Sequence, residues 1–311
     1  MISIIIPTFN RAEFLRESIW TLFSKQDAPF ECIIVDDAST DDTGDMVAAL
    51  QSEWGGSRVV LLRQENNQGA QVARNRGIDA ATGEYLLFMD SDDVPRPEGI
   101  LELYGHLQRN PDLGYCFGKV QKTDASLNSL GASDLVGSSF INEPREIAGY
   151  HWHTMGALYR RSGIERVGPW NPKLTGSQDW EYQARVKLFG GEGEFVDTLV
   201  GYWRQHEGER VGTSIFRPDY VHSVMLACGS ILSKAREAGQ CDALLERRIT
   251  KKLIVHALEW GANGYFEERK SCFKQAAASL SNDWFFSKII RGFSKLPMTT
   301  DALLWRLLTR C

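Results

Sequence analysis

The chain has 311 residues, 43% of them apolar and 24% charged, a composition typical of a globular protein with one domain plus an appendage or with two domains. The net charge of -5 argues against a general nucleic-acid binder. The sequence has no run of 18 apolar residues, so no membrane span is predicted. The cysteines are scattered without a C-x-x-C pair, which argues against a zinc site or disulfide framework and favours a reducing cytoplasm.

Short apolar runs in the first third of the chain predict buried strands, at residues 2–6, 32–35, 59–62 and 84–89. The segments between these strands have apolar residues at helical spacing, for example Leu15, Ile19 and Leu22, and are predicted to be helices. For the first helix, Asn10 and Glu13 have the spacing of a capping box. Alternating strands and helices with short links predict an α/β fold, Rossmann-like, with a mostly parallel sheet flanked by helices.

The pattern is looser beyond Pro97. A helix near 98–109 and a strand at 113–120 are followed by a Ser-, Gly- and Asn-rich segment, 123–149, which predicts irregular structure, in one interpretation a flap over a site. Regular secondary structure is predicted again after this segment, as a strand at 157–161 and a helix from about Gln178. From Pro218 onward only helices are expected, so we predict a catalytic α/β domain at 1–215 and a helical C-terminal region at 216–311.

The strand predicted at 84–89 stops on three carboxylates in the segment Asp-Ser-Asp-Asp. Asp90 and Asp92 are two residues apart, so on an extended backbone their side chains leave from one face while Ser91 points away. Carboxylates held this close favour a hard divalent cation between them. The alternative is a turn that caps the next helix, since Pro95 follows.

A second acidic pair, Asp36 and Asp37, ends the strand predicted at 32–35. Parallel strands bring their carboxyl ends to one edge of the sheet, which is where open α/β sheets bind ligands. The two acidic pairs are therefore expected along one rim, with a polar ligand on one side and a metal on the other.

Five motifs resemble the family 2 inverting glycosyltransferases of the GT-A fold, over residues 2 to about 215. The motifs are Ile-Ile-Pro-Thr-Phe-Asn10, Val-Asp-Asp-Ala-Ser-Thr40, Gly69 through Ala73-Arg-Asn-Arg-Gly77, Asp90-Ser-Asp92, and Val167-Gly-Pro-Trp through Gln178-Asp-Trp. Their order and their positions on the expected elements make the resemblance specific.

This resemblance implies binding of a nucleotide-diphosphate sugar, with a UDP-sugar favoured. It assigns Thr8 and Asp37 to the nucleobase, with Asp37 accepting from the ring imide, and Arg74 to the base or diphosphate. Asp90, with Ser91 beside it, would face the ribose or the metal. The resemblance makes Asp92 the direct ligand of a divalent cation, Mn²⁺ or Mg²⁺, which assists departure of the diphosphate.

Inversion also requires a base for the acceptor hydroxyl, and the resemblance points to Asp179. The family usually carries Glu-Asp at this point, whereas this chain has Gln178 before Asp179. His206 resembles a histidine near the metal. The Gln-x-x-Arg-Trp motif of the processive synthases is absent from the sequence, which favours transfer of a single sugar.

Each assigned residue also has a purely structural interpretation: a turn cap for Asp37, a solvated helix charge for Arg74, a helix-end charge for Asp179, or a packed histidine for His206. At the level of the whole protein, the alternatives are a haloacid-dehalogenase-like phosphotransferase and a sugar-nucleotide-binding domain without turnover. His151 and His153 lack a third ligand for zinc and fit acceptor contact or packing.

The last 28 residues, from Trp284 to Cys311, combine aromatic and leucine clusters with five basic residues and one acid. Two interpretations remain open: a helix on an anionic membrane surface, or packing against the catalytic domain or a second copy. The expected location is cytoplasmic, or peripheral on the cytoplasmic membrane face. The acceptor would be a glycan, a lipid-linked saccharide or a protein in surface polysaccharide or glycoconjugate biosynthesis, and no nucleic-acid partner is expected.

Overall fold

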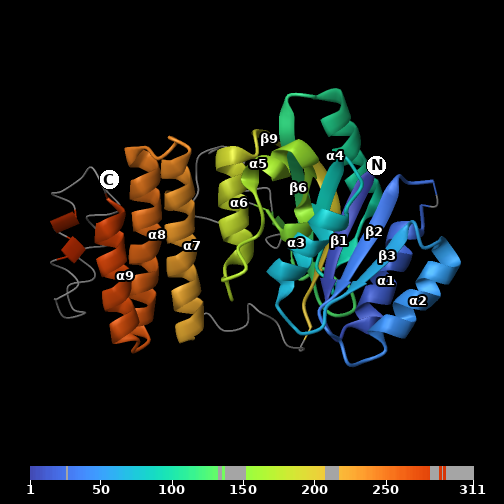
Figure 1. Cartoon of the computed structure of the whole chain (residues 1–311), viewed down its shortest axis with the longest axis horizontal. Coiled ribbons are helices and arrows are strands. Elements are labelled where there is room, and N and C mark those ends of the chain that lie inside the picture. Colours follow the sequence, from blue (N-terminus) through green and yellow to red (C-terminus); the bar gives the residue numbers. More distant parts are fainter. Residues whose placement is uncertain are drawn as a thin grey trace. The chain divides into compact units, whose positions relative to one another are not determined.

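The computed structural model of the chain describes residues 1–25, 27–131, 135–136, 152–206, 217–280, 287–288 and 290–291. Within these residues nine strands form one sheet in the order β3-β2-β1-β4-β8-β6-β9-β5, with β7 beside β6 (Figure 1). The strands are β1 Ile2–Thr8, β2 Phe30–Asp36, β3 Val59–Arg63, β4 Tyr85–Phe88, β5 Val94–Pro95, β6 Leu113–Thr123, β7 Leu135–Val136, β8 Ala157–Arg160 and β9 Glu192–Arg204.

The first half of the sheet is parallel throughout. Strand β1 pairs in parallel with both β2 and β4, and β2 pairs in parallel with β3. Strand β8 pairs antiparallel with both β4 and β6, whereas β6 and β9 pair in parallel. The α/β prediction of a mostly parallel sheet flanked by helices is confirmed, and so are the strands expected at 2–6, 32–35, 59–62 and 84–89.

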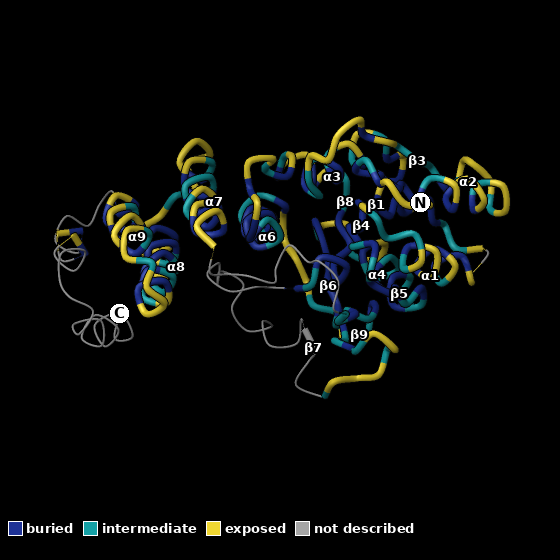
Figure 2. The backbone as a smooth tube through the Cα atoms, turned by 90° about the horizontal axis from the view of Figure 1, so that it is seen from below, coloured by how far each residue is buried: buried dark blue, intermediate teal, exposed yellow. Residues whose placement is uncertain are grey.

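Among the described residues, the helices that accompany this sheet are α1 Ala12–Phe23, α2 Thr43–Trp54, α3 Ala70–Ala80, α4 Pro97–Arg109 and α5 Arg161–Val167. Helix α6, Gln178–Phe189, follows in the chain. On one face of the sheet, the even-numbered residues Ile2, Ile4 and Ile6 of β1 join a buried cluster with apolar side chains of α1, α2 and α4. Ile5 points to the other face, toward α3. The central strands are accordingly buried along their length, whereas α2 exposes its outer turns (Figure 2).

Two expectations need correction. The 13-residue strand β9, which lies between β6 and β5 in the sheet, was not predicted. The capping box of Asn10 and Glu13 was wrong, because the residue before α1 is Arg11 and makes no side-chain cap bond. Asn10 instead has a left-handed backbone, φ 52°, and its side chain is used elsewhere.

Contacts divide the chain into two units. The first comprises Met1–Pro144, His151–Pro172 and Arg185–Gly208 and contains the sheet. The second includes Lys173–Ala184 and three helices that pack on one another, α7 Pro218–Glu237, α8 Ala243–Ala262 and α9 Phe266–Ser279. The segment before α6, with the start of α6, thus groups with the C-terminal helices. The domain limits 1–215 and 216–311 remain predictions.

Among the described residues, no helix is both long and apolar enough to span a bilayer. Most of the expected flap, 132–134 and 137–149, lies outside the described residues, and so does His151. The same holds for the C-terminal cluster from Trp284 to Cys311, apart from residues 287–288 and 290–291. Both interpretations of that cluster remain predictions.

Gly77 of α3 allows the helix to approach β1 closely. A Cβ built at this position would lie 2.4 Å from Cγ2 of Ile5. We expect Gly77→Ala to lower the free energy of unfolding by about 1 to 3 kcal/mol through overpacking, measured by urea denaturation. Gly44→Ala in α2 is the matched control, since its Cβ would make only an ordinary 3.5 Å contact with Arg63. Equal stability of the two variants would contradict this account.

Candidate active site

Acidic and polar side chains gather at the carboxyl ends of β1, β2 and β4. Because β1 lies between β2 and β4 in a parallel sheet, the ends of all three strands share one edge, and Thr8 is in register with Asp36. Asp37 follows β2 and donates its backbone N–H to the carbonyl of Thr8 at 2.9 Å. Asp90 and Asp92 follow β4, with the buried Ser91 between them.

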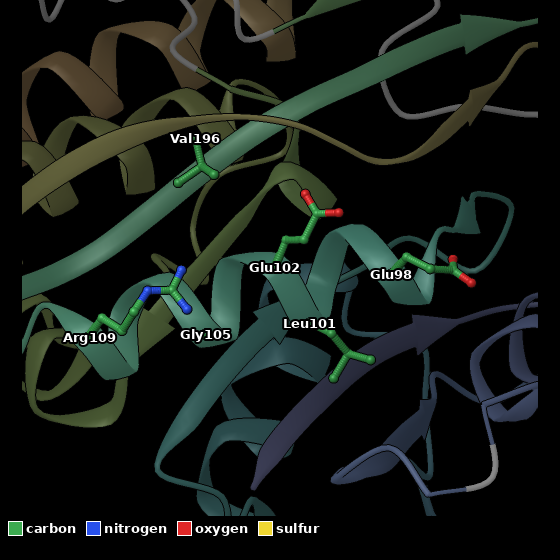
Figure 3. Close-up of a pocket in the computed structure, with 6 residues that line it drawn as sticks. All are labelled: Glu98, Leu101, Glu102, Gly105, Arg109 and Val196. Carbon is green, nitrogen blue, oxygen red and sulfur yellow. The ribbon is translucent and has the colours of Figure 1, made fainter.

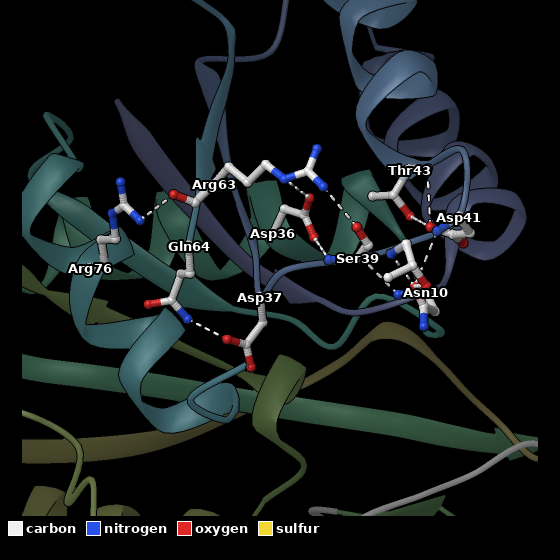
Figure 4. A network of polar contacts seen from close by, with 10 residues as sticks. Asn10, Asp36, Asp37, Ser39, Asp41, Thr43, Arg63, Gln64 and Arg76 are labelled. Carbon is white, nitrogen blue, oxygen red and sulfur yellow. Dashed lines mark hydrogen bonds and ion pairs between the residues drawn. The ribbon is translucent and has the colours of Figure 1, made fainter. Parts of the chain in front are cut away.

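Asp37 fastens the loop that leads into α3. Its Oδ1 accepts from the side chain of Gln64 (Figure 4). Oδ1 also accepts from the backbone N–H of Gln68 at 2.8 Å, and Oδ2 accepts from the N–H of Gly69 at 2.7 Å. A carboxylate oxygen has two lone pairs, so these bonds leave one acceptor position on Oδ2. Asp37 therefore has both a structural role and room for one further donor.

The loops after β1 and β2 are tied to each other. The side-chain carbonyl of Asn10 accepts from the N–H of Thr40 at 2.8 Å, and the hydroxyl of Ser39 accepts from the N–H of Asn10 at 2.9 Å (Figure 4). Asp36 in turn accepts from the N–H of Ser39 at 2.8 Å. These bonds hold Asn10 and Ala38 in left-handed backbone conformations that residues with a Cβ rarely adopt.

Arg74 of α3 is ion-paired and stacked. Its guanidinium lies 2.6 Å from Oδ1 of Asp90 and 4.5 Å from the ring centroid of Trp170, and its side chain is almost fully buried. Asn75 holds Trp170 in place, donating to its carbonyl at 2.9 Å and accepting from its N–H at 2.8 Å. Sequence reasoning did not assign roles to Trp170 and Asn75, which are 95 residues apart in the chain.

Several buried polar atoms at this edge have no hydrogen-bond partner within the described part of the chain. Among them are Oγ1 of Thr8 and Nε of Arg74. Buried polar groups are nearly always paired in native proteins, and a bound ligand is one way in which such a group becomes paired. Both atoms belong to residues that the sequence assigns to nucleotide binding.

Asp92 and His206 converge from different parts of the fold. Oδ2 of Asp92 lies 2.9 Å from Nε2 of His206, which follows β9, and the imidazole packs on Phe14 of α1 at 4.8 Å between ring centroids. On the same Phe14 ring lies Arg204, which is ion-paired with Glu17 at 2.6 Å. The position of His206 is thus fixed by α1 and β9 together.

The pair fits part of a divalent cation site. A carboxylate oxygen and an imidazole nitrogen are ligands that Mn²⁺ accepts, and a cation in a phosphate-transfer site commonly takes only one or two protein ligands. No cluster of three metal-binding side chains occurs in the ranges that the structure describes. Asp92 and His206 would therefore hold an ion together with phosphate oxygens of a substrate.

A further histidine lies close to Asp93. The side chain of His153 is mostly covered, its ring packs on Trp203 at 5.1 Å, and its Nε2 is 3.7 Å from Oδ2 of Asp93. Burial lowers the pKa of His153 below that of an ordinary imidazole, although the charges of Asp90 and Asp92 act in the opposite direction.

The remaining assigned residue, Asp179, belongs to the second unit. It is the second residue of α6, and its Oδ1 accepts from the N–H of Trp180 at 2.9 Å. Thr8, Asp37, Arg74, Asp90, Asp92 and His206 all belong to the first unit. The roles assigned to these residues remain predictions.

A separate groove lies over α4 and β9 (Figure 3). Its lining residues are Glu98, Leu101, Glu102, Gly105, Arg109 and Val196. None of them carries a role assigned from the sequence, and Glu98 forms an ion pair with Lys25 at 3.0 Å. The candidate active site is therefore the acidic edge rather than this groove.

The parallel sheet and the acids at its carboxyl edge define an α/β protein with a nucleotide-binding architecture. The chain matches the family model described as glycosyl transferase family 2 over residues 3–168, and it belongs to this family. Its resemblance to family 2 is thereby confirmed.

Relatives occur in several bacteria. Over 126 residues the chain is 35% identical to the glycosyltransferase GlyG of Streptococcus pneumoniae, a match that spans 40% of this chain and 41% of that protein. Over 186 residues it is 30% identical to a PGL/p-HBAD biosynthesis glycosyltransferase of Mycobacterium tuberculosis, spanning 60% of this chain and 69% of that protein.

Solved structures share the fold. The TarS 1–349 structure from S. aureus in complex with UDP-GlcNAc gives a TM-score of 0.72 at 19% identity, covering 98% of this chain and 91% of that one. The mannosyltransferase PcManGT from Pyrobaculum calidifontis, in complex with GDP-Man and Mn²⁺, gives a TM-score of 0.56 at 18% identity. This match covers 98% of this chain and 87% of that one. These likenesses confirm the GT-A fold with its C-terminal helices.

The stacked ion pair of Arg74 provides a test of the nucleotide site. Arg74→Lys keeps one positive charge but loses the planar group that contacts Asp90 and Trp170 together, so UDP affinity should fall about tenfold by calorimetry. Arg76→Lys is the matched control, because Arg76 is exposed and donates to the carbonyl of Arg63. Unchanged UDP affinity in Arg74→Lys would remove Arg74 from the site.

Proposed function

We propose that this protein transfers a single sugar from a nucleotide-diphosphate sugar, with UDP as the favoured nucleotide, to an acceptor hydroxyl with inversion at the anomeric carbon. The observation that carries the proposal is the acidic edge, where Arg74, Asp90, Asp92 and His206 converge beside Asp37. Family membership supports the reaction class, and the structure of TarS with UDP-GlcNAc supports a UDP-sugar as donor.

The nucleobase end of the donor would lie at Asp37 and Thr8. One lone pair remains on Oδ2 of Asp37, which suits the imide N–H of uracil, and the hydroxyl of Thr8 offers a second polar contact. Cytosine presents an acceptor where uracil presents its N–H, so the same carboxylate oxygen would repel it. The geometry thus supports selection among bases by a single acceptor.

The diphosphate would lie between Arg74 and the pair of Asp92 and His206. Arg74 supplies positive charge that is already held in place by Asp90 and Trp170. A divalent cation bound by Asp92 and His206 would neutralise charge on the departing diphosphate. PcManGT with GDP-Man and Mn²⁺ supports this choice of ion.

We assign the acceptor side to Asp179. An inverting transfer forms the new bond on the face opposite the leaving group, and the attacking hydroxyl must give up its proton to a base. Asp179 lies at the amino end of α6, where the helix dipole stabilises the carboxylate form that accepts a proton. The acceptor is proposed to be a glycan, a lipid-linked saccharide or a protein hydroxyl of a surface glycoconjugate.

The metal dependence can be tested by donor binding. Removing one ligand charge as Asp92→Asn should abolish the gain in UDP affinity that Mn²⁺ provides, while UDP affinity in EDTA changes little. Calorimetry of both forms, with and without Mn²⁺, measures this difference. Equal UDP affinity of the native protein in EDTA and in Mn²⁺ would show that donor binding does not use a metal.

The base can be tested by separating binding from transfer. Asp179→Asn should bind the donor as the native protein does, yet transfer the sugar about 100-fold more slowly, the usual scale for loss of a general base. Single-turnover assays with a panel of UDP-sugars and acceptors measure the rate. Normal turnover would reassign the role to another carboxylate, and donor binding without transfer or hydrolysis by the native protein would favour a binding domain without turnover.

A further inference from the structure

The segment that leads into α6 is fastened by side chains of α7. Within the second unit, the hydroxyl of Ser223 accepts from the N–H groups of Thr175 and Gly176, at 3.1 and 3.0 Å, and donates to the carbonyl of Gly176 at 2.6 Å. The ring of Tyr220 packs directly on Gly176, where an added Cβ would lie 2.5 Å from Cδ2. One turn of α7 therefore fixes the shape of this segment.

Ser177, two residues before Asp179, is held in a left-handed conformation with φ 53°. Its side-chain hydroxyl donates to the hydroxyl of Tyr220 at 3.0 Å in a buried setting. A non-glycine residue with this backbone is conformationally strained, and it persists only where surrounding contacts impose it. The Tyr220 bond is such a contact, and the strained residue determines the direction in which α6 begins.

Helix α8 contributes a cation beside Trp180, the residue that follows Asp179. The ammonium of Lys252 lies 4.1 Å from the ring centroid of the buried Trp180. Burial lowers the pKa of Lys252, while Cys228 of α7, Asp179 of α6 and Glu259 of α8 act in the opposite direction. Burial raises the pKa of Cys228 to about 12, so this thiol is neutral, and Glu259 also contacts His256 at 3.2 Å.

We propose that α7 and α8 are working parts of the active site, in which Tyr220, Ser223 and Lys252 are positioning residues for Asp179. This inference rests on the proposed role of Asp179 as base. Tyr220 and Ser223 fix the segment before the helix that carries the base, and Lys252 supports Trp180 while placing a positive charge near the carboxylate. The C-terminal helices then serve the transfer step rather than acting only as an appendage.

The first test is Tyr220→Phe, which removes the acceptor of the Ser177 hydroxyl and keeps the ring that packs on Gly176. We expect kcat to fall about fivefold, with the KM for the donor unchanged, because only the base is displaced. Ser223→Ala should have a larger effect. Ser233→Ala is the matched control on the same helix, since the Ser233 hydroxyl donates only to the exposed Glu237, at 2.9 Å.

The second test separates charge from packing at Lys252. Lys252→Met keeps the aliphatic stem against Trp180 but removes the charge, so the pKa of Asp179 should rise and the acidic limb of the kcat–pH profile should move to higher pH. Lys252→Arg should restore the native profile. A purely structural role would lower the melting temperature and leave the position of the limb unchanged.

Asp179→Asn, assayed in parallel, separates the proposed role of Asp179 as base from the positioning role of α7 and α8. If Asp179→Asn turns over normally, the proposed base is wrong. If Asp179→Asn is inactive while Tyr220→Phe has native kcat and Lys252→Met has the native pH profile, the base stands and the positioning role of α7 and α8 is overturned. A fall in kcat for Tyr220→Phe together with an upward shift for Lys252→Met supports the inference.

Discussion

Repulsion between carboxylates is the constraint that shapes the candidate active site. Strands β2 and β4 deliver several acids to one edge, and the groups that pair with them come from different parts of the fold. Asp36 accepts from its own loop and Asp37 from the segment between β3 and α3, while Asp90 pairs with Arg74 and Asp92 with His206. Since like charges this close raise one another's free energy, the loops after β1 and β2, helix α3 and the end of β9 must all be in place.

The two units of the fold carry different parts of the proposed reaction. The first unit contains all the groups assigned to the donor, on rigid strand ends and on α3. The second contains Asp179 and the helices whose side chains fix the segment before it. With the proposed roles, the acceptor could change without altering the nucleotide site, because the two sets of assigned residues belong to separate units.

The sequence predicts those parts of the fold that depend on local pattern. Buried parallel strands appear as unbroken apolar runs. The prediction that Asp90 and Asp92 share one face of an extended strand was wrong, because β4 ends at Phe88 and Asp92 lies in the turn that follows. Strand β9 was missed because Gly193, Gly201 and acidic residues interrupt its pattern. The cap of α1 was wrong because Asn10 bonds to Thr40, a contact across 30 positions that no local spacing reveals.

The stacking of Arg74 between Asp90 and Trp170 has a consequence for affinity. A long cationic side chain on a surface usually loses rotamer freedom at the moment when it meets its ligand. Here that entropy is lost during folding, because Asn75 fixes the tryptophan and the tryptophan fixes the guanidinium. If Arg74 binds the donor as proposed, the nucleotide would meet a guanidinium that is already ordered, so its binding would not carry the entropic cost of ordering that side chain.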